Sequence, residues 1–369
     1  MTTLLETPTL LAPIAIERPR ALEFGPGTVG AVARFVGARR ALVIADPFNA
    51  SRVDVLGLVD ATVFGEVAFE PDVATLDAAL AAAAQARPEV VIGFGGGSAM
   101  DLAKLVSVLG AQSLHDVVGA ELVHGREVAL VQVPTTAGTG SEGGTRALVT
   151  DPVTQNKLAV QSRHMLADLA VVDPDLTLTV PAHVTAATGV DALAHCVEAY
   201  TSRKAHPLID LHALEGARLV GRYLPRAVRD GSDREARAGL SLASLYGGFC
   251  LGPVNTTAGH AVAYPLGTRH HVPHGLACAL IFPHTLAFNA PAVPERTAAV
   301  LDALGCADEA DVSRWCEELG IDVRLSAHGV PEADLAAMAD EAHAIRRLLD
   351  NNPRDISRDE ILGLYRAAF

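Results

Sequence analysis

The spacing of apolar and polar positions changes about halfway along the chain. Up to residue 181, short apolar runs at 41–45 (ALVIA, unbroken), 90–92 and 128–133 (VALVQV) alternate with segments of helical spacing such as 29–37. Unbroken apolar runs of this length are typical of parallel strands that are buried on both faces. Their alternation with helices predicts a doubly wound α/β half.

From residue 182 onward, most segments have helical spacing and β-rich runs are nearly absent. The predicted helices cover 184–201, 207–223, 233–250, 256–266 and 275–288, followed by shorter amphipathic segments up to residue 369. A chain of 369 residues is long enough for two domains with separate cores. We therefore predict an α/β domain over residues 1–183 and a helical domain over residues 184–369.

Two of the predicted strands end in residues that suit a nucleotide. Asp46 follows the run 41–45, where an acid can accept hydrogen bonds from the adenosine ribose and repel a 2′-phosphate. A turn or helix-capping aspartate before Pro47 is an equally good interpretation. The run 90–92 leads into a glycine turn ending at Ser98, whose backbone N–H groups, with the dipole of the following helix, suit a pyrophosphate. A glycine turn alone is a weak signal, and Ser98 replaces the last glycine of GxGxxG.

A third turn follows the run 128–133 and reads PTTAGTGSE at residues 134–142. Its hydroxyls and glycines could hold phosphate, ribose and the nicotinamide amide. An ordinary loop remains the alternative, because the same residue types are common in turns.

Four residues of the C-terminal half form a candidate metal site. Asp191 and His195 are four residues apart in GVDALAHCVEAY, so in a helix their side chains lie on one face. His260 and His274 are fourteen residues apart in the stretch 259–278. Three imidazoles and one carboxylate form a plausible donor set for one divalent metal, Fe(II) or Zn(II).

The composition argues against several classes of function. A formal net charge of −14 disfavours nucleic acid as a partner, and aromatic residues are too few for single-strand stacking platforms. We find no window of about eighteen apolar residues free of charge, so a membrane span is not expected. The N-terminus lacks a basic region before its apolar residues and carries Glu6, which predicts a cytoplasmic protein. The five scattered cysteines include no CxxC pair, so we expect buried free thiols.

Several motifs occur in a fixed order along nearly the whole chain. They are FGPG at 24–27, GGGSAMDLAK at 95–104, PTTAGTGSE at 134–142, NKLAV at 156–160, DPDLTL at 173–178, GVDALAH at 189–195, HAVAYPLG at 260–267, PHG at 273–275 and NNPR at 351–354. By this set the chain resembles the iron-dependent (group III) alcohol dehydrogenases. One motif alone would be weak evidence, whereas the common order and spacing are specific.

The resemblance implies a fold, a cofactor and a metal. The implied fold class is α/β plus all-α, with an N-terminal Rossmann-like doubly wound parallel-sheet domain and a C-terminal helical metal-binding domain, as in dehydroquinate synthase-like proteins. Matched by position, the family's metal ligands fall on Asp191, His195, His260 and His274. The implied cofactor contacts are Asp46, Gly95, Gly96, Gly97, Ser98, Asp101, Thr135, Thr136, Thr139, Ser141, Lys157 and Leu176. Asp46 falls on the acid that favours NAD(H) over NADP(H).

The chain departs from the family pattern at the proton relay. Many relatives carry a second histidine four residues after the third metal ligand, and here that position is Tyr264. A tyrosine hydroxyl could relay a proton through ribose or water, or the residue could simply line the pocket. Tyr264 and His270 are the candidate catalytic residues. His270 is protonatable and lies near the ligand His274 in the sequence.

Basic residues near the implied site suggest a charged substrate. Arg146 lies where relatives acting on small neutral alcohols carry a residue that faces the substrate, and Arg269 and His271 lie close to His274. A guanidinium group matches carboxylate or phosphonate oxygens bidentately, although salt bridges to the abundant acids would also explain these arginines. The resulting hypothesis is a metal-dependent, NAD(P)H-linked reductase of a small carboxylated, phosphonylated or sulfonated aldehyde.

Other functions are compatible with the same scaffold. Maleylacetate reductases also take an anionic substrate, but those of the family carry a shorter TTYAGSE loop and tend to replace the metal-binding aspartate, whereas this chain keeps Asp191. A simple alcohol or polyol dehydrogenase would leave the basic residues without a role. A lyase or synthase would need extra acid–base residues, and a non-catalytic nucleotide-binding sensor would usually have lost a metal ligand. We expect a small-molecule substrate and a homo-oligomer such as a dimer, because relatives commonly assemble.

Overall fold

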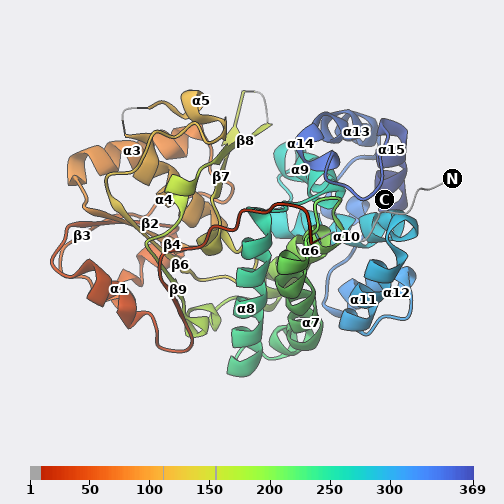
Figure 1. Cartoon of the computed structure of the whole chain (residues 1–369), viewed down its shortest axis with the longest axis horizontal. Coiled ribbons are helices and arrows are strands. Elements are labelled where there is room, and N and C mark those ends of the chain that lie inside the picture. Colours follow the sequence, from red (N-terminus) through yellow and green to blue (C-terminus); the bar gives the residue numbers. More distant parts are fainter. Residues whose placement is uncertain (1–9, 111, 154–155) are drawn as a thin grey trace. The chain divides into compact units, whose positions relative to one another are not determined.

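The computed structural model describes residues 10–110, 112–153 and 156–369, which form two compact units (Figure 1). The sheet unit comprises Glu17–Thr136 and Gly140–Thr179. The helical unit comprises residues 10–16, Ala137–Thr139 and Val180–Phe369. The chain therefore passes into the helical unit at Val180, a few residues before the boundary expected at residue 183. Three residues of the threonine-rich loop, Ala137–Thr139, also belong to the helical unit.

A six-stranded parallel sheet forms the centre of the sheet unit, in the order β1-β9-β6-β4-β2-β3. Its strands are β1 (Leu22–Phe24), β2 (Ala41–Ala45), β3 (Ala61–Phe64), β4 (Val90–Gly95), β6 (Ala129–Pro134) and β9 (Leu169–Val172). Counted from β2, five of these strands follow the doubly wound order 2-1-3-4-5. The chain moves to one side of β2 and then returns to the other. The carboxyl ends of β2 and β4 therefore flank the topological switch point, where such sheets usually bind ligands.

The central strands β2 and β4 are apolar and buried along their whole length because both faces of the sheet are covered there. Along β2, Leu42 and Ile44 enter one hydrophobic core, whereas Val43 and Ala45 enter another on the opposite face. The first core includes α3 (Val73–Ala86) and α4 (Gly97–Leu109), and the second includes α1 (Gly30–Val36) and the 3-10 helix η1 (Val53–Leu56). The unbroken apolar run that predicted a buried strand thus has its physical cause in two packed layers.

A smaller sheet of order β5-β8-β7 completes this unit. Its strands are β5 (Gly119–Ala120), β7 (Arg146–Asp151) and β8 (Asn156–Gln161), and the short helices are α2 (Pro47–Ala50), α5 (Leu114–Val117), η2 (Ser141–Gly143), η3 (Arg163–Met165) and η4 (Pro174–Thr177). β7 and β8 pair in antiparallel fashion. The apolar pattern did not reveal this pairing, because both strands are only partly buried.

The described part of the helical unit contains no strand. Its helices are α6 (Ala182–Thr201), α7 (Pro207–Arg229), α8 (Arg234–Leu251), α9 (Ala258–His270), α10 (His274–Asn289), α11 (Pro294–Leu304), α12 (Glu309–Glu318), α13 (Leu335–Ala344), α14 (Arg346–Leu349) and α15 (Arg358–Ala367), with short 3-10 helices η5 (Ala290–Ala292), η6 (Leu325–His328) and η7 (Glu332–Asp334). α6, α9 and α10 are buried around most of their circumference and share one core. Polar side chains on these three helices therefore lie in an apolar environment.

Among the described residues, one segment meets the length and composition of a membrane span. His274–Ala292 is apolar enough to qualify, and 67% of its window is buried inside the folded chain. The sequence pattern did not single it out because histidine, threonine, asparagine and proline interrupt its apolar residues. A buried core helix passes the same test, and this segment contributes α10 to the core of the helical unit.

The predicted fold class, a doubly wound parallel sheet followed by a helical domain, is confirmed. The five cysteines are free thiols, and all except Cys306 are buried.

Candidate metal and cofactor sites

Three helices of the helical unit bring the predicted metal ligands together. α6 carries Asp191 and His195 one turn apart, so both side chains leave the same face. His260 lies in the first turn of α9, and His274 is the first residue of α10. α6 contacts both α9 and α10, and these two helices contact each other. Residues that are distant in sequence therefore face one another, with His274 partly exposed and the other three buried.

The donor atoms of these four side chains have the spacing of ligands around one ion. Asp191 Oδ1 lies 3.9 Å from His195 Nε2, 3.6 Å from His260 Nε2 and 3.6 Å from His274 Nε2. The Nε2 atoms of His195 and His260 are 2.9 Å apart. Tetrahedral ligands at about 2.1 Å from a metal are separated by about 3.4 Å, which lies within this range.

Asp191 is a buried carboxylate with an oxygen that lacks a hydrogen-bond partner. The residue is 1% exposed, and no donor among the described residues reaches Oδ1. Burial would raise the pKa of this carboxyl, but the three surrounding imidazoles outweigh burial and hold its pKa well below the usual range. A buried, ionised carboxylate needs a nearby positive charge. The donor set therefore fits a divalent metal, and imidazole and carboxylate suit both Fe(II) and Zn(II).

The imidazoles respond differently to burial. Burial lowers the pKa of His195 to about 4, although Asp191 opposes the change. For His274, burial is outweighed first by Cys278 and then by Asp191, so that its pKa rises to about 10. The pKa of His260 also rises well above its usual value against the effect of burial, again chiefly through Cys278. Neighbouring groups thus raise the pKa of two of the rings, and a divalent cation would displace protons from such ligands on binding.

Two acceptors orient the ligand rings. Glu198 Oε1 lies 2.6 Å from His260 Nδ1, and its Oε2 accepts hydrogen bonds from Thr257 N at 2.5 Å and Thr257 Oγ1 at 3.0 Å. His195 Nδ1 lies 3.3 Å from the carbonyl oxygen of Gly138. A carbonyl can only accept, so this contact requires the proton on Nδ1 and leaves the Nε2 lone pair for a metal. The glutamate plays the same part for His260.

Close packing at Gly259 protects this arrangement. A Cβ atom at residue 259 would lie 2.5 Å from Glu198 Oε1 and 2.9 Å from its Cδ. Any side chain larger than hydrogen would therefore displace the carboxylate that holds His260. Glycine at this position is a direct requirement of the ligand geometry.

The two candidate proton donors occupy different surroundings. Tyr264 is 8% exposed, and its ring lies beside the rings of His260 and His274, with centroid distances of 6.4 and 5.9 Å. His270 lies in the last turn of α9, where its Nε2 is 3.5 Å from Asp334 Oδ2. Burial lowers the pKa of His270, although Asp334 opposes the change. Tyr264 thus lies against the metal ligands, whereas His270 pairs with an acid at η7.

The basic residues expected to bind substrate are engaged in other contacts or exposed. Arg269 Nη1 lies 2.6 Å from Glu341 Oε1, and its Nε has no partner among the described residues. His271 is exposed and ends α9 with a left-handed backbone. In the sheet unit, Arg146 begins β7 and donates from Nη2 to Gln161 Oε1 at 2.9 Å. Both arginines therefore have a partner.

In the sheet unit, Asp46 and the glycine loop lie together at the switch point. Asp46 caps α2 by accepting a hydrogen bond from Asn49 N at 3.0 Å, and its Oδ2 accepts another from Asn49 Nδ2 at 2.5 Å. A Cβ atom at Gly95 would lie 3.1 Å from Asp46 Oδ2 and 2.9 Å from Ala99 Cβ. The capping interpretation of Asp46 is therefore correct, and its carboxylate also borders the loop proposed to hold a pyrophosphate.

The start of α4 offers backbone donors to an anion. Gly96 is its N-cap and Gly97 and Ser98 begin the helix, with no side chain capping the first turn. The N–H groups of a helix's first turn have no intrahelical acceptor, so they can bind phosphate oxygens. Thr136 borders this loop, because a Cβ atom at Gly96 would lie 3.4 Å from Thr136 Oγ1.

Some of the other predicted cofactor residues are bonded to neighbouring side chains, whereas others are buried or partly exposed. Ser141 Oγ donates to Asp101 Oδ1 at 2.5 Å and accepts from Lys104 Nζ at 2.8 Å. Lys157 Nζ lies 2.8 Å from Glu70 Oε2. Leu176 and Thr135 are buried, whereas Thr139 is partly exposed and belongs to the helical unit.

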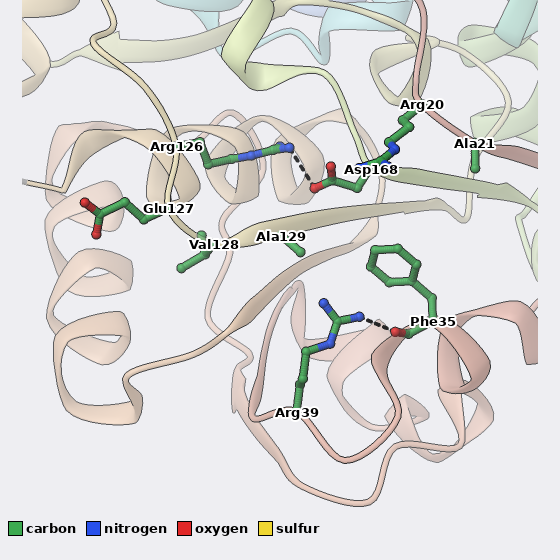
Figure 2. A pocket seen from close by; sticks show the side chains of 9 residues that line it. All are labelled: Arg20, Ala21, Phe35, Arg39, Arg126, Glu127, Val128, Ala129 and Asp168. Atoms are coloured by element: carbon green, nitrogen blue, oxygen red, sulfur yellow. Dashed lines mark hydrogen bonds and ion pairs between the residues drawn. The ribbon is translucent and has the colours of Figure 1, made fainter.

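A surface pocket of about 640 Å³ lies near the amino ends of β1, β6 and β9 (Figure 2). Its lining includes Arg20, Arg39 and Arg126. Figure 2 shows Arg126 directed at Asp168, 2.7 Å away, and Arg39 bonded to the backbone oxygen of Phe35. Because doubly wound sheets bind ligands at the carboxyl ends of their strands, we do not assign this pocket to the cofactor.

Two residues beside the metal ligands and one beside Tyr264 were missed by the sequence analysis. Glu198 follows His195 by three residues, and Cys278 follows His274 by four, so helical spacing alone could have placed both on the ligand faces. The third is Arg347, whose guanidinium carbon lies 5.7 Å from the ring centroid of Tyr264. No sequence signal brings α14 to α9.

Comparison with known proteins agrees with these observations. The family described as iron-containing alcohol dehydrogenase matches residues 19–174, and the C-terminal family of Fe-containing alcohol dehydrogenases matches residues 185–369. Long-chain-alcohol dehydrogenase 1 of Geobacillus thermodenitrificans (strain NG80-2) is 34% identical over 368 residues, covering 90% of each chain. Sulfoacetaldehyde reductase of Bilophila wadsworthia (strain 3_1_6) is 36% identical over 329 residues, covering 85% of each.

A solved structure gives the same result for the fold. The crystal structure of a 1,3-propanediol oxidoreductase is 30% identical, with a TM-score of 0.91 over 97% of this chain and 100% of that chain. The family that the sequence motifs predicted is thus confirmed over both halves of the chain. The protein belongs to the iron-containing alcohol dehydrogenase family of oxidoreductases.

Proposed function

We propose that this protein catalyses NAD(H)-linked hydride transfer between a small anionic aldehyde and its alcohol, with one divalent metal. The observation that carries the proposal is Asp191 Oδ1, which is buried without a hydrogen-bond donor and faces three imidazole nitrogens. A sensor that only binds a nucleotide has no need of a complete donor set. The presence of all four donors therefore favours catalysis.

The bound groups would supply the chemistry, and the chain would position them. A divalent metal in this donor set would polarise a carbonyl or lower the pKa of an alcohol, and NAD(H) would exchange the hydride. Glu198 keeps the His260 ring oriented, and Gly138 does the same for His195. The helix start at Gly97 would hold the pyrophosphate through backbone N–H groups.

We assign the proton transfer to Tyr264. Its ring packs against two of the ligand rings, so its hydroxyl is attached to a group already fixed beside the reacting position. His270 is the weaker candidate, because Asp334 faces its Nε2. A phenol can donate to a developing alkoxide when both are held in contact.

The substrate's negative charge would be met by Arg347. This residue is exposed, and no acid of the described chain pairs with it. Arg269 is less suitable because Glu341 already neutralises it. The guanidinium of Arg347 lies over Tyr264, which in turn contacts the ligands His260 and His274. The sulfonated substrate named for the Bilophila relative agrees in charge with this assignment.

The first prediction concerns activity itself. Metal-reconstituted protein with NADH should reduce succinic semialdehyde and phosphonoacetaldehyde. The loss of NADH absorbance would measure the rate of this reduction. His260→Ala should lower turnover by more than the roughly 10–100-fold that loss of an outer-sphere partner costs, because a ligand is removed. NADH binding should persist in this variant. Bound cofactor without turnover of any aldehyde in the wild type would favour the sensor.

Glu198→Gln should weaken metal binding by about 10–100-fold, because the carboxylate that orients His260 is lost. The dissociation constant would be measured by competition with a chromogenic chelator. Glu341→Gln, which makes the same change beside Arg269, is the control and should bind metal like the wild type. Equal affinities of all three proteins would contradict the role given to Glu198.

Asp46→Asn should shift the cofactor preference towards NADPH. Asparagine retains the helix cap but removes the charge that would repel a 2′-phosphate. We expect the ratio of kcat/KM for NADH over NADPH to fall about tenfold, equivalent to ~1.4 kcal/mol. Asp54→Asn, an exposed position in η1, is the charge-matched control. An unchanged ratio would remove Asp46 from cofactor selection.

Arg347→Ala should lower kcat/KM for succinic semialdehyde by about 10–100-fold, the cost of losing a charge-assisted hydrogen bond of ~1.5–3 kcal/mol. Activity on butanal, which is neutral, should change little. Arg346→Ala is the matched control, because Arg346 is adjacent to Arg347 in the sequence but pairs with Asp350. Arg146→Ala tests the sequence-based alternative. An equal loss on both aldehydes in the Arg347 variant would argue against anion recognition by this residue.

A further inference from the structure

Cys278 lies within the group of metal donors on the helix that carries His274. The two residues are one turn apart on α10, and Cys278 Sγ lies 3.7 Å from His274 Nε2. The donor atoms of Asp191, His260, His274 and Cys278 all lie within 4.8 Å of one another. The thiol is therefore part of the cluster by distance as well as by helical spacing.

Its surroundings differ from those of two other buried cysteines. Cys196 Sγ contacts the backbone oxygen of Ala243, and Cys250 Sγ contacts that of Tyr246, as expected for a thiol that packs as a small apolar residue. The recorded polar contact of Cys278 is instead the ring nitrogen of a metal ligand. Its side chain is 3% exposed, so water cannot readily take the place of that contact.

The distances agree with a shared ion. A metal that binds sulfur at about 2.3 Å and nitrogen at about 2.05 Å, with an angle of about 110° between them, separates the two donors by about 3.6 Å. The observed separation of 3.7 Å is close to this value. Asp191 Oδ1, the buried oxygen without a hydrogen-bond partner, belongs to the same group of donor atoms. This orphaned oxygen independently indicates a cation at the centre of the cluster.

We infer that Cys278 supplies a thiolate donor to the divalent metal, in addition to the aspartate and histidine ligands. The inference rests on the metal centre of the proposed function. A thiolate is a softer ligand than imidazole or carboxylate, so it should favour Zn(II) and Co(II) over Mn(II). Binding releases the thiol proton to solvent, and no electron is transferred.

Cobalt provides a direct test, because a thiolate bound to Co(II) gives a near-ultraviolet charge-transfer band that oxygen and nitrogen ligands do not give. Wild-type protein reconstituted with Co(II) should show this band, and Cys278→Ser should lose it. Cys316→Ser is the matched control, because Cys316 is a buried cysteine of α12. This variant should keep the charge-transfer band. Cys278→Ser should also raise the Zn(II) dissociation constant by at least about tenfold, with a smaller change for Mn(II).

Each outcome decides between the claims. A wild-type spectrum without the band, in protein that binds Co(II) and oxidises NADH, would overturn the thiolate donor and leave the proposed function intact. Failure to bind any divalent metal would overturn both. The wild-type spectrum is decisive by itself if Cys278→Ser does not fold, which far-ultraviolet circular dichroism would reveal.

Discussion

A buried carboxylate constrains the helical unit more than any other single group. Asp191 sits in the middle of α6, enclosed by apolar helices, and one of its oxygens has no hydrogen-bond donor. Removing such a charge from water costs several kcal/mol unless opposite charge is nearby. Three helices therefore have to present imidazoles to one point. The glycine at residue 259 and the carboxylate of Glu198 are secondary conditions of that convergence.

In the sheet unit, the order of the strands determines where the candidate cofactor residues meet. The order 2-1-3-4-5 leaves the carboxyl ends of β2 and β4 at a switch point, and the residues that follow them are Asp46 and the glycine loop. Neither feature is specific alone, since Asp46 caps a short helix and glycine turns are common. The topology makes them neighbours, and the contact distance at Gly95 requires that the loop have no side chain there.

Local spacing explains which parts of this picture the sequence could predict. Buried strands follow from short apolar runs, and helices and the pair Asp191 and His195 follow from a period of about 3.6 residues. The sequence offered His260 and His274 as further donors by residue type, and the family resemblance matched them to the same metal, because no local pattern encodes contacts between helices. Pairing of charges is similarly nonlocal. Arg269 looked available in the sequence, but folding brings Glu341 to it from 72 residues away.

Because the net charge is −14, recognition of the proposed anionic substrate would be a local problem. The overall field of such a chain repels anions, but salt screens exposed charges beyond about 8 Å at physiological ionic strength. An anion at the active centre would therefore respond chiefly to cations within that range. A divalent metal held by the four donors would be one such cation, and an exposed arginine above Tyr264 is another. Arginines that already face an acid contribute little net potential, so Arg347 is better suited than Arg269 to select a charged aldehyde.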